Sequence, residues 1–340
     1  MIQQTSCAIP SAQPNSGTHP MTNVTMATAD SQAYTRAYNG AVLNLGGMTS
    51  SSGAFQVLAD GTNSVVDFTA LSGLWTSAGN SSWHSLDARN GGAILIPNVQ
   101  HLVQAYLTLN SNAVVTTPQL RRLNSVTLTV NGARPDFAGL TNLDQTSWTV
   151  SKGGTVVLSN LAPVATNMTW VLNQGSVADL TALRAVALAN YGATWEARGA
   201  GTLLDLSGVT NVNMASANSY AYVQAHEGGR VDLSGLRSSS GAFLVTADGT
   251  NSVVDFSGLS GRWSSEGYNN PLTLDARAGG SVLIPNVAEV FRASLTVSSN
   301  STLITSQLRR LTSTTVTVNG GRPNLSSLTD LNNTTWNVNN

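Results

Sequence analysis

The sequence repeats itself at an offset of 188 residues without a gap. SSSGAFQVLADGTNSVVDF from Ser50 returns as SSSGAFLVTADGTNSVVDF from Ser238, and LDARNGGAILIPNV from Leu86 returns as LDARAGGSVLIPNV from Leu274. Roughly 55% of positions are identical between residues 22–152 and 210–340. A gapless match of this length favours an architecture that adds equal units along one direction.

A shorter phrase recurs inside this unit at spacings of 20 to 28 residues. It consists of an apolar residue, then Asp, Asn or an apolar residue, then Leu, Phe or Ile, two small residues or proline, and Leu or Val. Its centres are Leu45, Phe68, Ile96, Phe137, Leu158, Leu180, Leu206, Leu233, Phe256, Ile284 and Leu325, with Thr117 and Thr305 as polar versions. The long unit therefore holds eight short repeats, and the chain holds about thirteen.

Each short repeat contains alternating stretches such as Thr127–Val130, followed by Gly or Asn turn signals. Ala178–Ala189 is the best candidate for a helix, but it carries the repeat phrase and is interpreted as another coil. Strands and turns at this period predict an all-β fold, a single-stranded parallel β-helix (solenoid) of about thirteen coils of 20–28 residues each. The crossover rule makes it right-handed. The β-helix is expected over residues 22–340, with 1–21 as a non-repeat leader or N-terminal cap.

Charged residues make up only 10% of the chain, with 16 basic and 17 acidic residues. Nucleic-acid binding needs a dense cationic face, so this partner is excluded. No apolar run approaches the roughly 18 residues of a spanning helix, so no membrane span is expected. Ser, Thr, Asn and Gly replace the charges, as in secreted β-proteins, which favours an extracellular or cell-surface location although no signal peptide is visible.

Aspartates occupy one slot of the repeat phrase. The set is Asp67, Asp136, Asp179, Asp205, Asp232 and Asp255, with Asn44 and Asn324 as variants. The slot precedes a turn, where an Asx side chain can accept a backbone N–H group. A calcium ladder is the alternative, but the Gly-Gly-x-Gly-x-Asp nonapeptide is missing. We expect turn capping, and neither a metal site nor a cofactor.

Two charged phrases recur in both copies. Asp87 with Arg89, and Asp275 with Arg277, lie two residues apart and are expected to form surface ion pairs. The doublets Arg121-Arg122 and Arg309-Arg310 fall in turns. These arginines are candidates for binding an anionic sugar, while the alternative is a solvated turn whose arginine stems cover apolar edges.

Two inserted loops, 73–85 and 261–273, are the strongest candidates for ligand contacts. The first contains Trp75, Trp83 and His84, and the second contains Trp263 and Tyr268. Aromatic rings on a rigid scaffold suit the faces of sugars. Trp75 and Trp263 align between the copies and are expected to fold back over the core, so Trp83 and Tyr268 are the better candidates for exposed contacts.

The phrase AHEGGRVDLSGL at Ala225–Leu236 resembles the coils of large bacterial surface proteins. These proteins, similar in type to haemagglutinin-like adhesins and autotransporter passengers, are parallel β-helices. The resemblance covers nearly the whole chain beyond residue 21. It implies the coil architecture and no particular ligand.

No catalytic motif is present, and no catalytic residue is assigned. The leading hypothesis is a non-enzymatic extracellular structural or adhesive solenoid that binds a polysaccharide or a host or cell-surface glycan. The alternative is a carbohydrate-active enzyme, a polysaccharide lyase or glycoside hydrolase, because such enzymes use Asp and Arg on coil faces. The last coil lacks a visible cap, which predicts either that the chain is a piece of a longer array or that it associates end to end through that coil.

Overall fold

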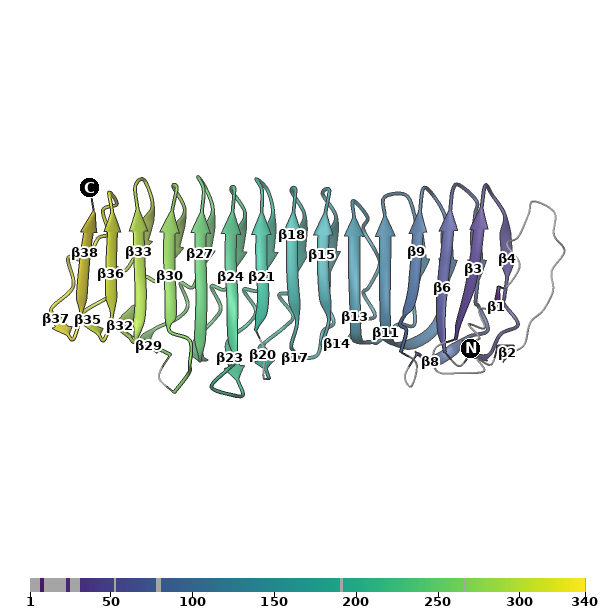
Figure 1. The fold of residues 1–340 in the computed structure, drawn as a ribbon, viewed down its shortest axis with the longest axis horizontal. Helices are drawn as coiled ribbons and strands as arrows, with labels where there is room; N and C mark the ends of the chain where they lie inside the picture. Colours follow the sequence, from purple (N-terminus) through teal and green to yellow (C-terminus); the bar gives the residue numbers. More distant parts are fainter. Residues whose placement is uncertain are drawn as a thin grey trace, which may run out of the picture. The chain divides into compact units, whose positions relative to one another are not determined.

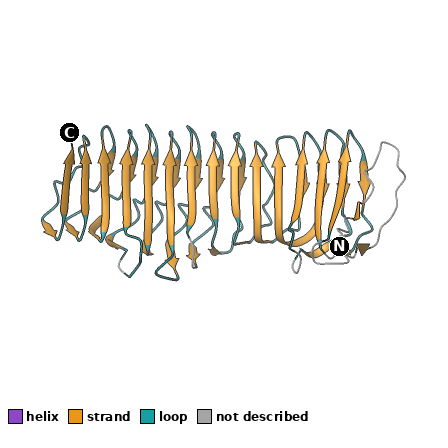
Figure 2. Ribbon diagram, viewed as in Figure 1, coloured by secondary structure: helices purple, strands orange, loops and turns teal. Residues whose placement is uncertain are grey.

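The computed structural model describes residues 7–8, 23–24, 31–51, 53–77, 81–189, 192–265 and 267–339. All regular structure within these ranges is β-strand, and no helix occurs in them (Figure 2). The described part of the chain accordingly contains no helix that could cross a membrane. The chain divides into two compact units, Met1–Asn160 and Leu161–Asn340.

Each unit is a stack of parallel coils, and the two units together hold about 14 turns. This confirms the predicted all-β parallel β-helix of about thirteen coils. Ala178–Ala189 belongs to coils as predicted, because it spans the strands Val177–Asp179 and Ala185–Leu188. Of the predicted leader, only Cys7–Ala8 is described, as a strand paired with Gln32–Tyr38; the rest of 1–21 lies outside the described residues.

A coil of unit 1 contains a long strand, a short strand and a third strand. The long strands are β3 (Gln32–Tyr38), β6 (Ala54–Asp60), β9 (His84–Arg89), β11 (Asn98–Asn110), β13 (Arg122–Asn131) and β15 (Ser147–Ser151). The short strands are β4 (Val42–Asn44), β7 (Val65–Asp67), β10 (Ala93–Leu95), β12 (Val114–Thr116) and β16 (Thr155–Val157). The remaining strands are β1 (Cys7–Ala8), β2 (Asn23–Val24), β5 (Ser50–Ser51), β8 (Ser72–Thr76) and β14 (Asn142–Asp144).

Unit 2 has the same plan. Its long strands are β18 (Thr169–Asn173), β21 (Ala193–Arg198), β24 (Tyr220–His226), β27 (Ala242–Asp248), β30 (Leu272–Arg277), β33 (Ala293–Ser298), β36 (Thr315–Asn319) and β38 (Thr335–Asn339). Its short strands are β19 (Val177–Asp179), β22 (Leu203–Asp205), β25 (Arg230–Asp232), β28 (Val253–Asp255), β31 (Ser281–Leu283) and β34 (Thr302–Ile304). Its third strands are β17 (Val164–Thr166), β20 (Ala185–Leu188), β23 (Asn211–Met214), β26 (Ser238–Ser240), β29 (Gly261–Ser264), β32 (Val287–Phe291), β35 (Arg310–Thr312) and β37 (Asp330–Asn332).

The strands of successive coils lie parallel to one another (Figure 1). Their pairing follows the same register in the two copies. Gln56 of β6 pairs with Ser85 of β9, and the equivalent residues Leu244 and Thr273 pair in unit 2. Side chains alternate along long strands such as β6 and β27 between the buried interior and the outer surface. Residues of paired strands therefore stack on their counterparts in the next coil, apart from register shifts between β8 and β11 and between β29 and β32.

The repeated phrase Leu-Asp-Ala-Arg-x-Gly-Gly has a geometric reason. Asn90 and Gly91 follow β9 with positive φ values of 53° and 84°, the left-handed pair of a tight turn. At Gly92, a Cβ atom would collide with the carbonyl oxygen of Ala59 in the preceding coil. Gly91 is thus needed for its backbone conformation, and Gly92 is needed because a side chain would not fit.

The aspartate column caps turns, as predicted. Each side chain accepts the backbone N–H of the residue two positions later, at 2.8 to 3.2 Å. The acceptors are Asn44, Asp67, Asp136, Asp179, Asp205, Asp232, Asp255 and Asn324. The described residues include no group of three or more His, Cys, Asp or Glu side chains that could hold a metal ion.

The interior carries a repeated aromatic cluster. In unit 1 the ring of Phe55 lies 5.9 Å from Phe68 and 6.0 Å from Trp75, centre to centre. The equivalent rings in unit 2, Phe243, Phe256 and Trp263, are separated by 5.0 to 5.9 Å. The copies therefore share their core packing as well as their sequence.

The capping interaction predicts how Asp205 tolerates substitution. Asp205→Ala removes the acceptor for the Ser207 N–H group and should lower the free energy of unfolding by about 1 kcal/mol. Asp205→Asn keeps a side-chain oxygen, as at Asn44 and Asn324, and should stay within about 0.5 kcal/mol of the parent. Urea unfolding measures both. An equal loss in the two variants would mean that the charge matters and the acceptor does not.

Candidate functional site

The arginine doublets do not lie in turns as predicted: they follow the turns, and Arg122 and Arg310 begin the strands β13 and β35. Two of the four arginines bond to the protein's own backbone or to an acidic neighbour. Arg121 donates through Nη1 to the carbonyl oxygens of Pro118, Leu120 and Gly139, at 3.2 to 3.4 Å. Arg310 pairs with Asp330 at 2.7 Å. Arg122 and Arg309 are exposed. Sugar binding by these four residues stays a prediction, and for Arg121 the contacts describe a clamp between coils.

Three loop candidates lie in the interior. Trp75 and Trp263 are each 1% exposed, and both pack in the aromatic clusters, as expected for these two positions. His84 is fully buried, with its ring centre 4.7 Å from that of Trp75. Residues 78–80 and 266 of the two loops lie outside the described residues.

The His84 imidazole is held as a neutral ring. Its Nδ1 accepts the Phe55 N–H group at 3.1 Å, so the proton is carried on Nε2. Burial lowers its pKa to about 4, and the nearby Thr76 backbone opposes this shift only in part. Such a group contributes to packing and strand spacing.

Tyr268 is half-buried and joins its loop to earlier coils. Its hydroxyl donates to the Met214 carbonyl at 3.0 Å. The neighbouring Asn269 donates its backbone N–H to Ala217 at 2.8 Å. Arg292 holds the same loop by donating to the Tyr268 carbonyl at 2.7 Å.

Trp83 is half-buried and stacks on a ring that the sequence did not single out. Its ring centre is 5.2 Å from that of Tyr106, with an interplanar angle of 30°. Tyr106 is 50% exposed and points outward from β11. Gln56 of β6 donates to the Trp83 carbonyl at 3.2 Å and so fixes the end of the loop.

A polar hollow of about 410 Å³ lies beyond Tyr106 on the same face. Thr108 and Asn110 follow Tyr106 at alternate, outward positions of β11 and line the hollow. We call the aromatic pair and this hollow the outer patch of unit 1. Its members are Trp83, Tyr106, Asp87, Arg89, Asn90, Thr108, Asn110, Ser111, Asn131 and Lys152.

A chain of hydrogen bonds orders the hollow. Asn131 donates to Asn110 Oδ1 at 3.0 Å, and Ser151 donates to Asn131 Oδ1 at 2.7 Å. Arg89 pairs with Asp60 at 3.0 Å and with Asp87 at 3.9 Å. The predicted Asp87–Arg89 pair thus exists, but the shorter contact is with Asp60 one coil away.

Burial raises the pKa of Asp87, and the Asp60 charge adds to this shift while Arg89 opposes it. The pKa of Asp275, its equivalent in unit 2, is raised for the same reasons, by burial and Asp248 against Arg277. The ionisation of this aspartate is therefore shifted in the same way in the two copies.

The aromatic part of the patch occurs in one copy only. Pro271 stands at the position equivalent to Trp83, and Ser294 at that of Tyr106. Asn110 is replaced by Ser298, so Asp275 Oδ1 lacks the amide that reaches Asp87 Oδ1 at 3.5 Å. Comparing the two copies could have identified Tyr106 from the sequence, because an outward tyrosine in one copy corresponds to a serine in the other.

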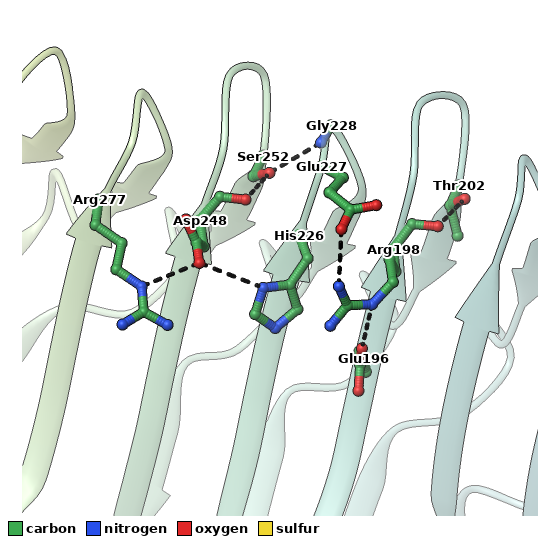
Figure 3. Close-up of polar contacts among 9 residues, drawn as sticks. All are labelled: Glu196, Arg198, Thr202, His226, Glu227, Gly228, Asp248, Ser252 and Arg277. Atoms are coloured by element: carbon green, nitrogen blue, oxygen red, sulfur yellow. Dashed lines mark hydrogen bonds and ion pairs between the residues drawn. The ribbon is translucent and has the colours of Figure 1, made fainter.

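Unit 2 carries a ladder of charges at the ends of β21, β24, β27 and β30 (Figure 3), in which the Asp248–Arg277 pair is the equivalent of Asp60–Arg89 in unit 1. Arg198 bonds Glu196 at 3.1 Å and Glu227 at 2.9 Å. Asp248 receives Arg277 at 3.1 Å on one side and faces His226 Nδ1 at 4.0 Å on the other. The predicted Asp275–Arg277 pair forms at 3.6 Å.

The pKa values of the groups in this ladder depend on burial and on the charges next to each group. Burial and the positive charge of Arg198 lower the pKa of His226, although Glu196 and Asp248 oppose them. Burial also lowers the pKa of Arg198, but its bonds to Glu196 and Glu227 outweigh this and raise it overall. The ladder is a compensated network in which each arginine already holds two carboxylates.

No protein-family model matches this chain, and neither a curated protein nor a solved structure matches it significantly.

The buried histidine predicts a pH dependence of stability. The pKa of His84 is about 4 in the folded protein, against an ordinary value of 6.5, so the unfolded chain binds the extra proton between these values. Above pH 6.5 the imidazole is neutral in both states and the free energy of unfolding is at its full value. As the pH falls from 6.5 to below 4, the free energy of unfolding decreases by about 3 kcal/mol in total.

His84→Leu tests this dependence, because leucine occupies the equivalent position 272. The variant leaves the Phe55 N–H group without its acceptor, which should cost about 1–3 kcal/mol at pH 7. Its stability should then fall less steeply than the parent's between pH 7 and pH 4 in urea unfolding. Leu272→His should steepen the same profile. Parallel profiles for the parent and His84→Leu would contradict the burial of a neutral imidazole.

Proposed function

We propose that this chain is a non-enzymatic structural or adhesive β-solenoid of the extracellular space or cell surface. In this proposal the outer patch of unit 1 binds a polysaccharide or cell-surface glycan. The observation that carries it is the stacked Trp83–Tyr106 pair beside a polar hollow on a rigid sheet.

The chemistry of the patch suits a sugar. A pyranose ring has an apolar C–H face that packs on an aromatic ring, and the outward face of Tyr106 is available for this contact. Its hydroxyl groups need donors and acceptors in fixed positions, which Thr108, Asn110 and Asn131 supply. Lys152 adds positive charge for a carboxylate or sulfate group, whereas Arg89 is already paired with Asp60 and Asp87.

The alternative, a polysaccharide lyase or glycoside hydrolase, has less support. Glycoside hydrolysis uses two carboxylates on opposite sides of the bond. Among the described residues that line the hollow, Asp87 is the one carboxylate, and Arg89 lies beside it. The carboxylates of the charge ladder are paired with arginines. The bacterial adhesin type of protein is likewise a proposal, supported by the coil phrase and the solenoid architecture.

Tyr106→Ser tests the glycan site, because serine is the residue at the equivalent position 294. After a glycan array identifies a ligand, the variant should bind it at least tenfold more weakly, since a stacking contact contributes about 1.5 kcal/mol. Tyr222→Ser removes an exposed tyrosine of unit 2 and is the matched control, which should leave binding unchanged.

Two results would contradict this proposal. The first is equal affinity of Tyr106→Ser and the parent for the array ligand. The second is release of reducing ends or unsaturated products from neutral or uronate polysaccharides, which would favour the enzyme.

We also propose self-association through the last coil. Within the described residues β38 pairs with β36 only, and Trp336 and Val338 are 39% and 70% exposed. In register with them lie Val316 and Val318 of β36, of which Val316 is buried. A second copy of this chain, adding a strand along β38, would cover these side chains.

Sedimentation velocity tests the association across a concentration series. The parent should form larger species as the concentration rises, and Val338→Lys should reduce them. Val157→Lys, at an exposed valine of unit 1, is the control and should behave as the parent. A concentration-independent monomer would overturn the proposal.

A further inference from the structure

The short sheet of unit 1 is interrupted by a proline. β12 pairs with β10, whereas residues 133–137 of the following coil form no strand. By the repeat phrase, Pro135 takes the central position that Val115 has in β12. Proline has no N–H group to donate, so this coil cannot continue the ladder.

A cavity of about 360 Å³ lies where the ladder stops. It is lined by the apolar residues Leu109, Val114 and Pro135 and by the polar residues Thr117, Arg134 and Asp136, among others. Its volume falls in the range of small-molecule sites, about 300–1,000 Å³. It shares no lining residue with the outer patch.

The proline and the break in the sheet recur in unit 2 at Pro323, but the two copies differ in one hydrogen bond. In unit 2, the Thr305 hydroxyl donates to the carbonyl oxygen of Asn324 at 2.7 Å and ties the two coils together. Thr117, the equivalent residue, is 6% exposed, and its hydroxyl has no hydrogen-bond partner within the described residues. This hydroxyl bond therefore ties the two coils in unit 2 and is missing in unit 1.

The charges of the cavity indicate the class of ligand. Arg134 is exposed and forms no ion pair or hydrogen bond with the part of the chain that the structure describes. A free guanidinium next to apolar walls matches a carboxylate on an apolar body. Asp136 also lines the cavity and would repel a second negative charge.

We propose that this cavity binds a small organic monocarboxylate. Its apolar ring or chain packs against Val114 and Pro135, and its carboxylate pairs with Arg134. Both an aromatic acid and a sugar acid have this chemistry. The proposal is independent of glycan binding at the outer patch.

Saturation-transfer NMR and titration of the full chain test the proposal with four probes. Benzoate is compared with benzyl alcohol, and D-glucuronate with D-glucose, so that each acid has a neutral counterpart. At least one acid should bind, and at least tenfold more tightly than its neutral counterpart. Binding of benzoate would identify an aromatic acid as the ligand class, and binding of D-glucuronate would identify a sugar acid.

Two variants locate the site. Arg134→Gln should weaken binding of that acid at least tenfold, whereas Arg322→Gln, the equivalent change in unit 2, should leave it unchanged. Both arginines are exposed, and circular dichroism checks that the fold is retained. The proposal is overturned if neither acid binds, if the neutral probes bind equally well, or if Arg134→Gln has no larger effect than Arg322→Gln.

Discussion

Parallel backbone pairing between successive coils is the constraint on which each unit depends. Every coil donates to and accepts from its neighbours, so residues must stack at about 4.8 Å in one register. The pairs Gln56–Ser85 and Leu244–Thr273 show this register in both copies. A coil that lost it would turn its core side chains outward.

The corners of the coils follow from the same constraint. A chain that returns to the same place after each turn must bend at fixed points without leaving buried polar groups unpaired. The Asx column supplies an acceptor at one corner, and left-handed residues such as Asn90 and Gly91 form the turn at another. Buried hydroxyls complete the pattern: Ser252 accepts the Gly228 N–H group at 2.9 Å and donates to the Asp248 carbonyl at 2.7 Å (Figure 3).

The outer faces are free of this constraint, and there the copies differ. Arg198 and Glu227 form an ion pair in unit 2, while the position equivalent to Glu227 in unit 1 is Asn39. Surface ion pairs contribute about 0–1 kcal/mol, so such ladders contribute little to stability. Trp83 and Tyr106 differ from their counterparts at no cost to the core, which is the reason to seek a ligand on that face.

The sequence by itself determined the solenoid, the number of coils, the Asx caps and the burial of Trp75 and Trp263. These features recur at every coil or in both copies, so the period of the sequence indicates which residues stack and which side faces the core. Tertiary structure decided the contacts that occur once: the Trp83–Tyr106 stack, the clamp of Arg121 on Gly139, the shorter bond of Arg89 to Asp60, and the cavity beside Pro135. Each joins side chains from different coils, and their distances depend on loop paths and rotamers that no repeat period specifies.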